Sequence, residues 1–360
     1  MNNLAKRKNF WKNKRVLITG HTGFKGVWLS LTLKLFGAKI LGYSLAPPTS
    51  PSLFNIVKLK NIIFKSVISD IRNKNKLEKE IKLFKPEIIF HLAAQPLVIE
   101  SYKDPYKTFE TNSMGTLNIL EVLRKYNKFK SALIITTDKV YDTKNDKLAY
   151  KESDPLGVTD PYGSSKYISE ILTQSYSKSF FNEQNYLKVA TARAGNVIGG
   201  GDFSENRLIP DYLRSLKRNC SLFIRNSNHI RPWQHVMEPI YGYIILSELI
   251  YKKKINKKDF AWNFAPNNSN SIKVRDLIDL INKLSFKKVK IQYSKEKIKF
   301  SETVILKLSN IKAKKKLDWK PIYNLHDTLS AILEWHKYYI YKKNIHLLIK
   351  KQINDFILKS

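Results

Sequence analysis

The first half of the chain alternates short apolar runs with amphipathic stretches, and this alternation limits the fold more than any other feature. Runs of strand length are RVLIT, KILGYS, EIIFHLAA, ALIITT at 132–137 and VATAR, which ends at Arg193. Segments of helical period lie between them, near residues 74–85, 108–126 and 161–180. Strands that alternate with helices favour a parallel sheet covered on both faces. We therefore predict an α/β protein with a Rossmann-like, doubly wound parallel sheet.

Three glycines follow the first strand at a spacing of three residues. Gly20 suits a tight turn, Gly23 suits close approach of backbone N–H groups to a diphosphate, and Gly26 suits packing of the next helix on the sheet. The positive end of that helix would face the phosphates. The spacing G-x-x-G-x-x-G, between a strand and a helix, predicts a dinucleotide site. We expect the side chains of His21 and Lys25 to reach phosphate, with solvent exposure of both as the alternative.

The residues that would hold the adenosine half of the cofactor are less clear. A dinucleotide fold usually places an acidic residue about 20 positions after the glycine loop, where it binds the ribose. No Asp or Glu occurs from Gly20 to Ile68. We expect Ser44 to take part of this role, and Asp70 with Ile71 to meet the adenine amino group. The loop itself leaves NAD and NADP both open.

The regular alternation ends after Arg193. The stretches AGNVIGGGDFSENRLIPD and RNSNHIRPWQHV are rich in glycine, proline, aromatic and charged residues. We expect a smaller C-terminal α/β domain that contributes loops to a cleft, with a terminal helix from about residue 336. The predicted division is a cofactor-binding domain at 10–194 with a returning segment at about 232–262, and a substrate-binding domain at 195–231 and 263–360.

The formal net charge of +34 raises the question of a nucleic-acid partner. Lysines scattered along the whole chain supply nearly all of it, whereas a nucleic-acid binder more often carries a clustered, arginine-rich stripe. We therefore expect no nucleic-acid partner. No apolar run approaches the ~18 residues of a membrane span, so we expect no membrane partner. One cysteine, Cys220, excludes an internal disulfide and suits a reducing cytoplasm.

Tyr162 and Lys166 are the first candidates for catalysis. On a helix these positions share a face, and an ammonium beside a phenol favours the phenolate, which can accept a hydroxyl proton during hydride transfer. The spacing alone is weak evidence, because it recurs in this lysine-rich chain at Tyr126, Tyr293, Tyr338 and Tyr339. Tyr162 differs from these because it lies one element after the ALIITT strand.

The ALIITT strand ends in TTDKVYD, where Thr137, Asp138 and Lys139 would project from its carboxyl end. Doubly wound sheets bind ligands at that end. A simple redox enzyme or an epimerase needs only a hydroxyl here. An acid and a second proton carrier favour an elimination. A solvent-exposed turn at the strand end is the alternative.

Eight blocks of sequence carry a family resemblance: GHTGFKGVWLSL, GYSLAPPTSPSLF, FHLAAQPLV, TNSMGTLNILE, TTDKVYD, DPYGSSK, RAGNVIGGGDF and IRPWQHV. Together they resemble the extended short-chain dehydrogenase/reductase superfamily over about residues 10–340. GYSLAPPTSPSLF, IRPWQHV and the Asp138–Lys139 pair look like the family of CDP-glucose 4,6-dehydratases. The dehydratases for dTDP-glucose and GDP-mannose carry a glutamate where this chain has Lys139.

The resemblance implies an NAD-dependent hydro-lyase that converts CDP-glucose to CDP-4-keto-6-deoxyglucose for a surface glycan such as O-antigen. The C4 hydroxyl is oxidised, water leaves across C5 and C6, and the hydride returns to C6. Tyr162 would be the base at O4, Lys166 would lower its pKa and hold the nicotinamide ribose, and Thr137 would bind the sugar hydroxyl. Asp138 would protonate the departing C6 hydroxyl, and a neutral Lys139 would assist at C5.

The resemblance also assigns binding residues. Those expected to line the cofactor, besides the glycine loop, are Phe24, Leu92, Ala93, Ala94 and Asn112, and those expected to bind substrate are Gln95, Asn196, Arg207, Arg231 and His235. His91 either joins the cofactor site or, as we favour, packs at a strand end. Trp233 is structural or functional, and Gly199–Gly201 would form a tight loop beside the substrate. No Cys/His cluster predicts a metal site.

Three alternatives remain at this point. One is a nucleotide-sugar 4-epimerase, and another is a 4,6-dehydratase of a different nucleotide sugar. The third is a non-catalytic member or a charge-driven binding protein, against which Thr137, Tyr162 and Lys166 argue. No residue identifies itself as the reader of the cytosine edge. We expect a homodimer or a higher homo-oligomer, as is common in the superfamily.

Overall fold

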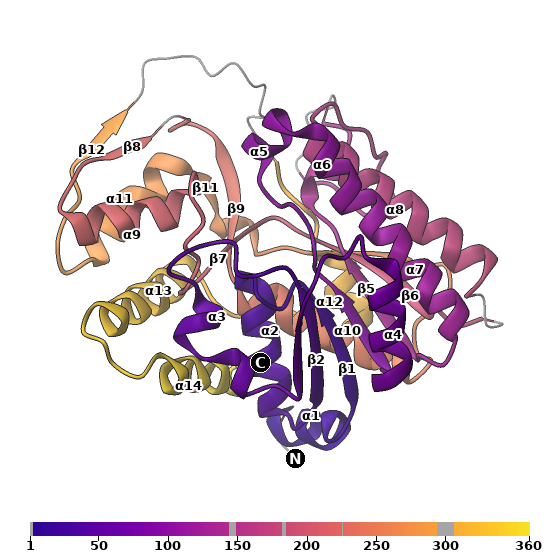
Figure 1. The fold of residues 1–360 in the computed structure, drawn as a ribbon. Coiled ribbons are helices and arrows are strands. Elements are labelled where there is room, and N and C mark those ends of the chain that lie inside the picture. The colour runs from indigo at the N-terminus through magenta and orange to yellow at the C-terminus, as the bar shows by residue number, and fades with distance from the viewer. Residues whose placement is uncertain (1–2, 144–148, 182–184, 225, 294–305) are drawn as a thin grey trace.

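The computed structural model describes residues 3–143, 149–181, 185–224, 226–293 and 306–360. Within these residues the centre is a parallel sheet of seven strands in the order β10-β6-β5-β4-β1-β2-β3 (Figure 1). This order confirms the predicted Rossmann-like sheet, and its topological switch point lies between β1 and β4. The strands are β1 (Arg15–Thr19), β2 (Lys39–Ser44), β3 (Lys65–Ile68), β4 (Ile88–His91), β5 (Ser131–Ile135), β6 (Val189–Ala194) and β10 (Ala261–Phe264).

Neighbouring residues of the strands point to opposite faces, and each face has its own hydrophobic core. Val16 and Ile18 of β1 join a core that includes residues of three helices: α2 (Phe24–Leu35), α10 (Met237–Tyr251) and α14 (Ile345–Leu358). Leu17 joins the opposite core, which includes residues of α4 (Lys74–Phe84) and α7 (Gly115–Tyr126). α8 (Pro161–Ser179) lies beside α7 (Figure 1). Because both faces are covered, the strands read as continuous apolar runs.

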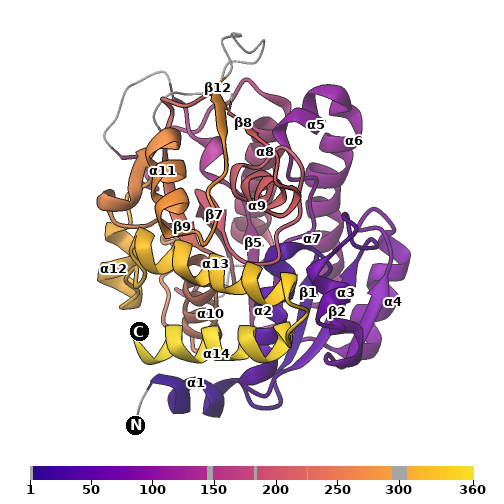
Figure 2. The ribbon, with the colours of Figure 1, turned by 90° about the vertical axis from the view of Figure 1, so that its left-hand side faces the viewer.

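Two predicted helices are interrupted in the structure. The segment expected at 108–126 consists of α6 (Pro105–Phe109), a five-residue π-helical turn (Glu110–Met114) and α7. The tail expected as one helix from about 336 is two, α13 (Leu325–Ile340) and α14, which lie side by side (Figure 2). The chain reverses between them at Lys342, whose φ is 52°. An additional N-terminal helix, α1 (Asn3–Trp11), packs on α14.

The chain after Arg193 builds two further small sheets and a third core. In one sheet β9 (Ile230–His235) lies between β7 (Asn196–Ile198) and β11 (Ser271–Lys273), and in the other β8 (Leu222–Ile224) pairs with β12 (Ile291–Tyr293). Residues of α9 (Leu208–Arg218), α11 (Val274–Leu284) and α13 form the third core with them. The exact domain boundaries remain a prediction, although β10 and α10 do return to the large sheet. Across the described ranges, no helix combines the length and the apolar character that crossing a membrane requires.

Three further short α-helices pack on larger elements, the first on α2, the second on α8 and the third on β10 and α10. They are α3 (Leu53–Ile56), α5 (Val98–Lys103) and α12 (Ile311–Leu317).

Candidate active site

The glycine loop forms a turn that leaves no room for side chains at two of its glycines. Gly20 follows β1 directly and has a φ of +76°, and a Cβ there would lie 2.8 Å from the backbone N of Ala93. Leu92 and Ala93 follow β4 directly, so the segments after the two strands that flank the switch point are in contact at Gly20. A Cβ on Gly26 would collide with the carbonyl oxygen of Gly20. These contacts hold the first turn of α2 tightly against the loop.

Gly23 differs from the other two glycines, because the space beside it is open. A Cβ there would meet only the Gly20 oxygen, at 3.4 Å. Gly23 is the N-cap of α2 and offers no side-chain acceptor to the free N–H groups of the first turn. An anion at this position would accept those hydrogen bonds and face the positive end of the helix. The loop therefore fits the diphosphate of a dinucleotide.

The His21 side chain does not point toward the expected phosphate position. Its ring is fully buried over Gly42 of β2, where any Cβ would collide with it, and its Nε2 lies 2.7 Å from Ser66 Oγ of β3. Burial lowers its pKa to about 4. The expected contact between the His21 side chain and phosphate is therefore wrong for this structure, since a neutral ring packed against the sheet cannot serve as a phosphate cation. Its backbone N–H remains in the loop.

Lys25, in contrast, lies among charged groups of the site rather than in solvent. Burial and the neighbouring Arg207 lower its pKa to about 8, and Asp138 acts in the opposite direction. Lys25 also acts on Lys166, whose pKa it helps to lower. The phosphate-loop lysine thus belongs to the same electrostatic cluster as the predicted catalytic residues.

The predicted adenosine-binding residues lie at the carboxyl ends of β2 and β3. Ser44 Oγ is 2.9 Å from Thr22 Oγ1, which ties the end of β2 to the glycine loop. The Asp70 carboxylate accepts from Arg72 at 2.8 Å, and that hydrogen bond holds the pKa of Asp70 below its usual range. Ile71 is buried in the core. Ser44 and Asp70 are therefore on the expected edge, and their contacts with a cofactor stay predictions.

The proposed elimination residues lie on a 3₁₀ turn (Asp138–Val140) directly after β5. Thr137 Oγ1 donates to Asp138 Oδ1 at 3.0 Å and accepts from the Lys139 backbone N at 3.3 Å. The other carboxylate oxygen, Asp138 Oδ2, is buried without a partner among the described residues. Burial raises the pKa of Asp138, against opposing effects of Lys139 and Thr137. This carboxyl is suited to donate a proton.

Tyr162 and Lys166 occupy the first turns of α8, where Asp160 caps the helix by accepting from the Gly163 N at 2.9 Å. Burial raises the pKa of Tyr162 to about 12, and a hydrogen bond with Thr137 opposes that rise. Lys166 Nζ donates to the Ile135 carbonyl oxygen at 2.9 Å. Burial and Lys25 lower the pKa of Lys166 to about 8.

The two residues therefore share a face as predicted, but the protein alone does not favour the phenolate. Lys166 is not among the main causes of the shift in the pKa of Tyr162, which are burial, Thr137 and Arg207. The predicted lowering of that pKa would need a further positive charge near the phenol.

Three predicted residues hold the site together through their side chains. Asn112, in the π-helical turn, donates to Gln95 O at 3.1 Å and to Ser165 Oγ of α8 at 2.9 Å. The Gln95 amide donates to Leu97 O at 3.0 Å, within its own loop. His91 Nδ1 lies 2.8 Å from Thr19 Oγ1, which confirms its interpretation as a packed strand-end histidine. The π-helical turn that carries Asn112 interrupts a helix, and interruptions of this kind are frequent at functional sites.

The predicted substrate residues divide into two groups. Arg207 acts electrostatically on Tyr162, and Arg231 acts on Asp138, which places each arginine near a catalytic group. Asn196 begins β7 and pairs with Trp233 of β9, the strand that also carries Arg231. His235 is instead buried, with its ring against Trp28 at a centroid distance of 5.7 Å. A direct contact between His235 and substrate is therefore not part of our proposal.

The triglycine loop Gly199–Gly201 packs against the helix that follows the phosphate loop. The Gly200 carbonyl accepts from Trp28 Nε1 at 3.0 Å, and a Cβ on Gly199 would lie 2.9 Å from the Phe24 ring. Trp233 is buried in the third core, which supports a structural role. Among the residues described, no cluster of His, Cys, Asp and Glu is arranged to hold a metal ion.

Comparisons with known proteins agree with this geometry. The family model described as GDP-mannose 4,6 dehydratase matches residues 17–332. A CDP-glucose 4,6-dehydratase of Salmonella typhimurium is 44% identical over 97% of this chain and 98% of its own length. Among solved structures, dTDP-glucose 4,6-dehydratase from Bacillus anthracis in complex with NAD has a TM-score of 0.75 at 23% identity, over 90% of this chain and 96% of that one. The epimerase Mth375 from Methanothermobacter thermautotrophicus has a TM-score of 0.82 at 22% identity, covering 97% of both chains. The chain therefore belongs to the GDP-mannose 4,6 dehydratase family, as the resemblance of its motifs to the nucleotide-sugar dehydratases predicted.

Proposed function

We propose that this protein is an NAD-dependent hydro-lyase that dehydrates CDP-glucose to CDP-4-keto-6-deoxyglucose. The observation that carries the proposal is the buried Asp138 carboxyl, with one unpaired oxygen and a raised pKa, beside the hydrogen-bonded Thr137 and Tyr162. A hydroxyl and a phenol suffice for oxidation alone, whereas a proton donor next to them suits the loss of water. The relative of known name that covers almost the whole chain supports CDP-glucose as the substrate.

In the oxidation step Tyr162 takes the proton from O4 while Thr137 holds that hydroxyl. Lys166 orients the nicotinamide ribose from its place against the end of β5. Bound NAD would supply the hydride acceptor for C4 and the hydride donor for C6. The open N-terminus of α2 would hold its diphosphate.

In the elimination step Lys139 takes the proton from C5, which the new C4 ketone acidifies. Asp138 protonates the C6 hydroxyl, which leaves as water. The hydride then returns to C6 and a proton returns to C5, so the product is a 4-keto-6-deoxy sugar and the cofactor ends in its starting state. Both residues lie on one turn, so one segment of chain would serve C5 and C6 together.

The surroundings of the site suggest how the nucleotide is held. Arg207 and Arg231 would bind the diphosphate, since guanidinium groups match phosphate oxygens, and Asn196 would assist them.

We place the reaction in the cytoplasm, where the single, exposed Cys220 of the protein would remain reduced. The product would supply a surface glycan such as O-antigen. From the family resemblance we also propose a homodimer or a higher homo-oligomer.

The decisive experiment compares CDP-, dTDP-, GDP- and UDP-glucose as substrates, with products identified by mass and NMR. Loss of water from CDP-glucose alone supports the proposal, and loss of water from another nucleotide sugar moves the assignment to that substrate. A stereoisomer of unchanged mass would instead identify a 4-epimerase. Retention on heparin at high salt, without turnover of any sugar, would favour a charge-driven binding protein.

Two substitutions test the assigned roles within the reaction. Tyr162→Phe removes the base at O4, so the first oxidation should fall by about 10²–10⁴-fold. Asp138→Asn leaves that base in place and should slow mainly the dehydration. Full turnover by the Tyr162→Phe enzyme would contradict the assignment of the base.

A further inference from the structure

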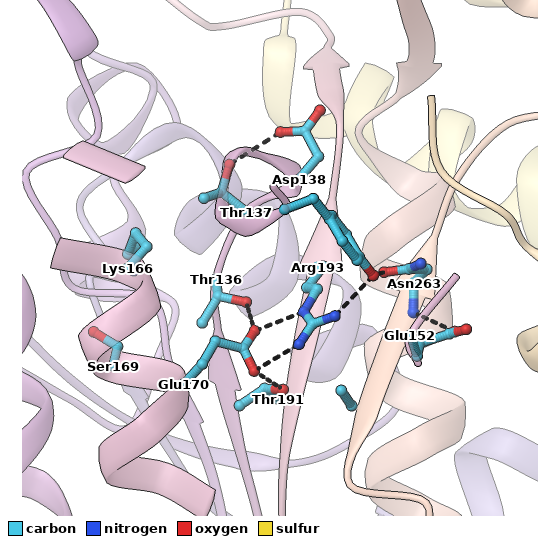
Figure 3. Close-up of polar contacts among 12 residues, drawn as sticks. Thr136, Thr137, Asp138, Glu152, Lys166, Ser169, Glu170, Thr191, Arg193 and Asn263 are labelled. Atoms are coloured by element: carbon cyan, nitrogen blue, oxygen red, sulfur yellow. Dashed lines mark hydrogen bonds and ion pairs between the residues drawn. The ribbon is translucent and has the colours of Figure 1, made fainter. Parts of the chain in front are cut away.

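A buried ion pair lies behind the catalytic residues, and the proposed mechanism does not use it. Glu170 of α8 and Arg193 of β6 are each 3% exposed and approach to 2.8 Å. Glu170 Oε1 also accepts from Thr136 Oγ1 at 2.5 Å, and Oε2 accepts from Thr191 Oγ1 at 2.6 Å (Figure 3). Burial opposes ionisation, but Arg193 and these hydroxyls outweigh it and hold the pKa of Glu170 below its usual range.

The hydrogen bonds of the pair extend to β10, the edge strand next to β6. Arg193 Nη1 donates to the Tyr141 hydroxyl at 2.7 Å, and that hydroxyl donates to Asn263 Oδ1 of β10 at 2.8 Å. The Asn263 backbone N in turn donates to Glu152 at 2.9 Å. One connected set of hydrogen bonds therefore joins α8, β6, β10 and the segment that follows β5.

The residues that bond to the ion pair flank the proposed catalytic segment in the sequence. Thr136 comes immediately before Thr137–Val140, the segment with the proposed elimination residues, and Tyr141 comes immediately after it. Glu170 lies one helical turn beyond Lys166 and two turns beyond Tyr162, on the same face of α8. The ion pair thus contacts the residues at both ends of the segment that carries Asp138 and Lys139. One member of the pair lies on α8, the helix that carries Tyr162 and Lys166.

We propose that Glu170 and Arg193 are positioning residues, which set the turn carrying Asp138 and Lys139 relative to Tyr162 and Lys166. The inference rests on the proposed dehydratase function. Both residues line a cavity of about 860 Å³ between α8, β10 and α12, and Glu170 also acts electrostatically on Lys166. That cavity gives nearby side chains room to move when a contact of the pair is lost, so loss of a contact relaxes the turn.

Relaxation of the turn should affect the two half-reactions unequally. Tyr162 and Lys166 keep other anchors, namely the Asp160 cap and the bond from Lys166 to Ile135 O. The turn keeps backbone bonds at its two flanks, from Thr136 N to Ala192 O at 2.9 Å and from Gly157 N to Val140 O at 3.0 Å, besides its internal bonds to Thr137. Because Thr137 starts this segment, oxidation at C4 slows as well, but proton transfer at C5 and C6, where both Asp138 and Lys139 come from the turn, becomes misaligned to a greater extent.

The test is Tyr141→Phe, which removes the hydroxyl that receives Arg193 and keeps the ring. The matched control is Tyr176→Phe, farther along α8, which removes a hydroxyl that donates to Glu121 at 2.5 Å. Each enzyme is mixed with NAD and limiting CDP-glucose, quenched at intervals and analysed by mass spectrometry. The measured quantity is the ratio of the ketone that still contains the C6 hydroxyl to the dehydrated product.

We expect this ratio to rise about tenfold or more in Tyr141→Phe and to stay at the wild-type value in Tyr176→Phe, although both variants lose thermal stability. Thr136→Val, which removes the hydroxyl on Glu170, should give the same signature, and Thr136→Ser should restore the wild-type ratio. Slower turnover at an unchanged ratio in both Tyr141→Phe and Thr136→Val would overturn the positioning role and leave the dehydratase function intact. Failure of the wild-type protein to release water from any nucleotide hexose would overturn the function itself.

Discussion

At the scale of single residues, two glycines of the phosphate loop serve different purposes. The fold requires Gly20, whereas Gly23 leaves space for a ligand. Gly20 must be glycine for the fold, because its φ is positive and the backbone of β4 lies where a Cβ would be. Gly23 has ordinary backbone angles, φ −79° and ψ 164°, and open space beside it. The same methyl group should therefore have different effects at the two positions.

We expect Gly20→Ala to destabilise the protein and Gly23→Ala to weaken cofactor binding. A left-handed backbone costs an alanine roughly 1–2 kcal/mol, and the contact with Ala93 adds to that loss. At Gly23 the methyl group occupies the space for the diphosphate, which should cost about 1–3 kcal/mol of binding free energy. Thermal unfolding without NAD and calorimetric titration with NAD separate the two effects. Equal changes in stability and affinity for both variants would contradict this division.

For some candidate site residues the place in the fold was predictable from the sequence, and for others it was not, for physical reasons. Tyr162, Lys166, Thr137 and Asp138 each follow a strand or begin a helix, so local pattern places them. The side chain of His21 follows no local rule. Its direction depends on the missing Cβ of Gly42, a residue of another strand that becomes its neighbour only when the sheet forms.

At the scale of elements, the strands were predictable because burial on both faces makes them uniformly apolar. The interruption between α6 and α7 was not, because TFETNSMGT contains no proline and its only glycine follows the π-helical turn. That turn places Asn112 where its amide meets both Gln95 and Ser165. Contacts with two other elements, rather than local preference, account for the break.

One contact between elements should make stability depend on pH. Glu238 of α10 is 1% exposed and accepts from the backbone N of Tyr323 at 2.7 Å and of Ile322 at 3.0 Å. Burial raises its pKa from 4.5 to about 8. Between these values the folded state holds a proton that the unfolded state releases, so this group's contribution to stability is complete below pH 4.5 and is lost as pH rises toward 8.

Glu238→Gln keeps an acceptor for Tyr323 and Ile322 and removes the ionisation. We expect the variant to gain stability over the wild type at pH 8 but not at pH 4.5, as measured by urea unfolding. Glu100→Gln, in an exposed ion pair with Lys103, is the control and should show no such pH-dependent gain. A variant that is equally destabilised at both pH values would show that Glu238 is ionised in the folded protein.

At the scale of the whole molecule, the contacts that sequence analysis missed join distant segments. Glu170 and Arg193 are 23 positions apart, and Tyr141 and Asn263 are 122 apart. The spacing of Tyr162, Lys166 and Glu170 along one helix face was visible in the sequence. The strands that pack against this helix face were not visible in the sequence, because the sheet order brings β6 and β10 together only in the folded protein.

Buried neutral histidines should make the molecule sensitive to acid. The pKa of His21 and of His336 is lowered to about 4, and that of His91 and of His235 to about 3, in each case mainly by burial. Unfolded histidine binds its proton near pH 6.5. Between pH 6.5 and 4 the unfolded state therefore holds more protons at these four sites, and stability falls as pH falls. Glu238 acts in the opposite direction, but it is one group against four.

His336→Phe tests this argument, because the Nε2 of His336 is buried without a partner among the described residues and the ring is 4% exposed. Removing one such site should reduce the slope of unfolding free energy against pH by at most about 1.4 kcal/mol per pH unit. Urea unfolding from pH 7 to 5 in moderate salt measures that slope, with the salt screening the repulsion expected from a formal net charge of +34. Wild-type stability that does not fall toward pH 5 would mean that the buried histidines take up protons without unfolding. A smaller slope in the variant would instead assign part of the acid sensitivity to a ring on α13, outside the phosphate loop and the catalytic helix.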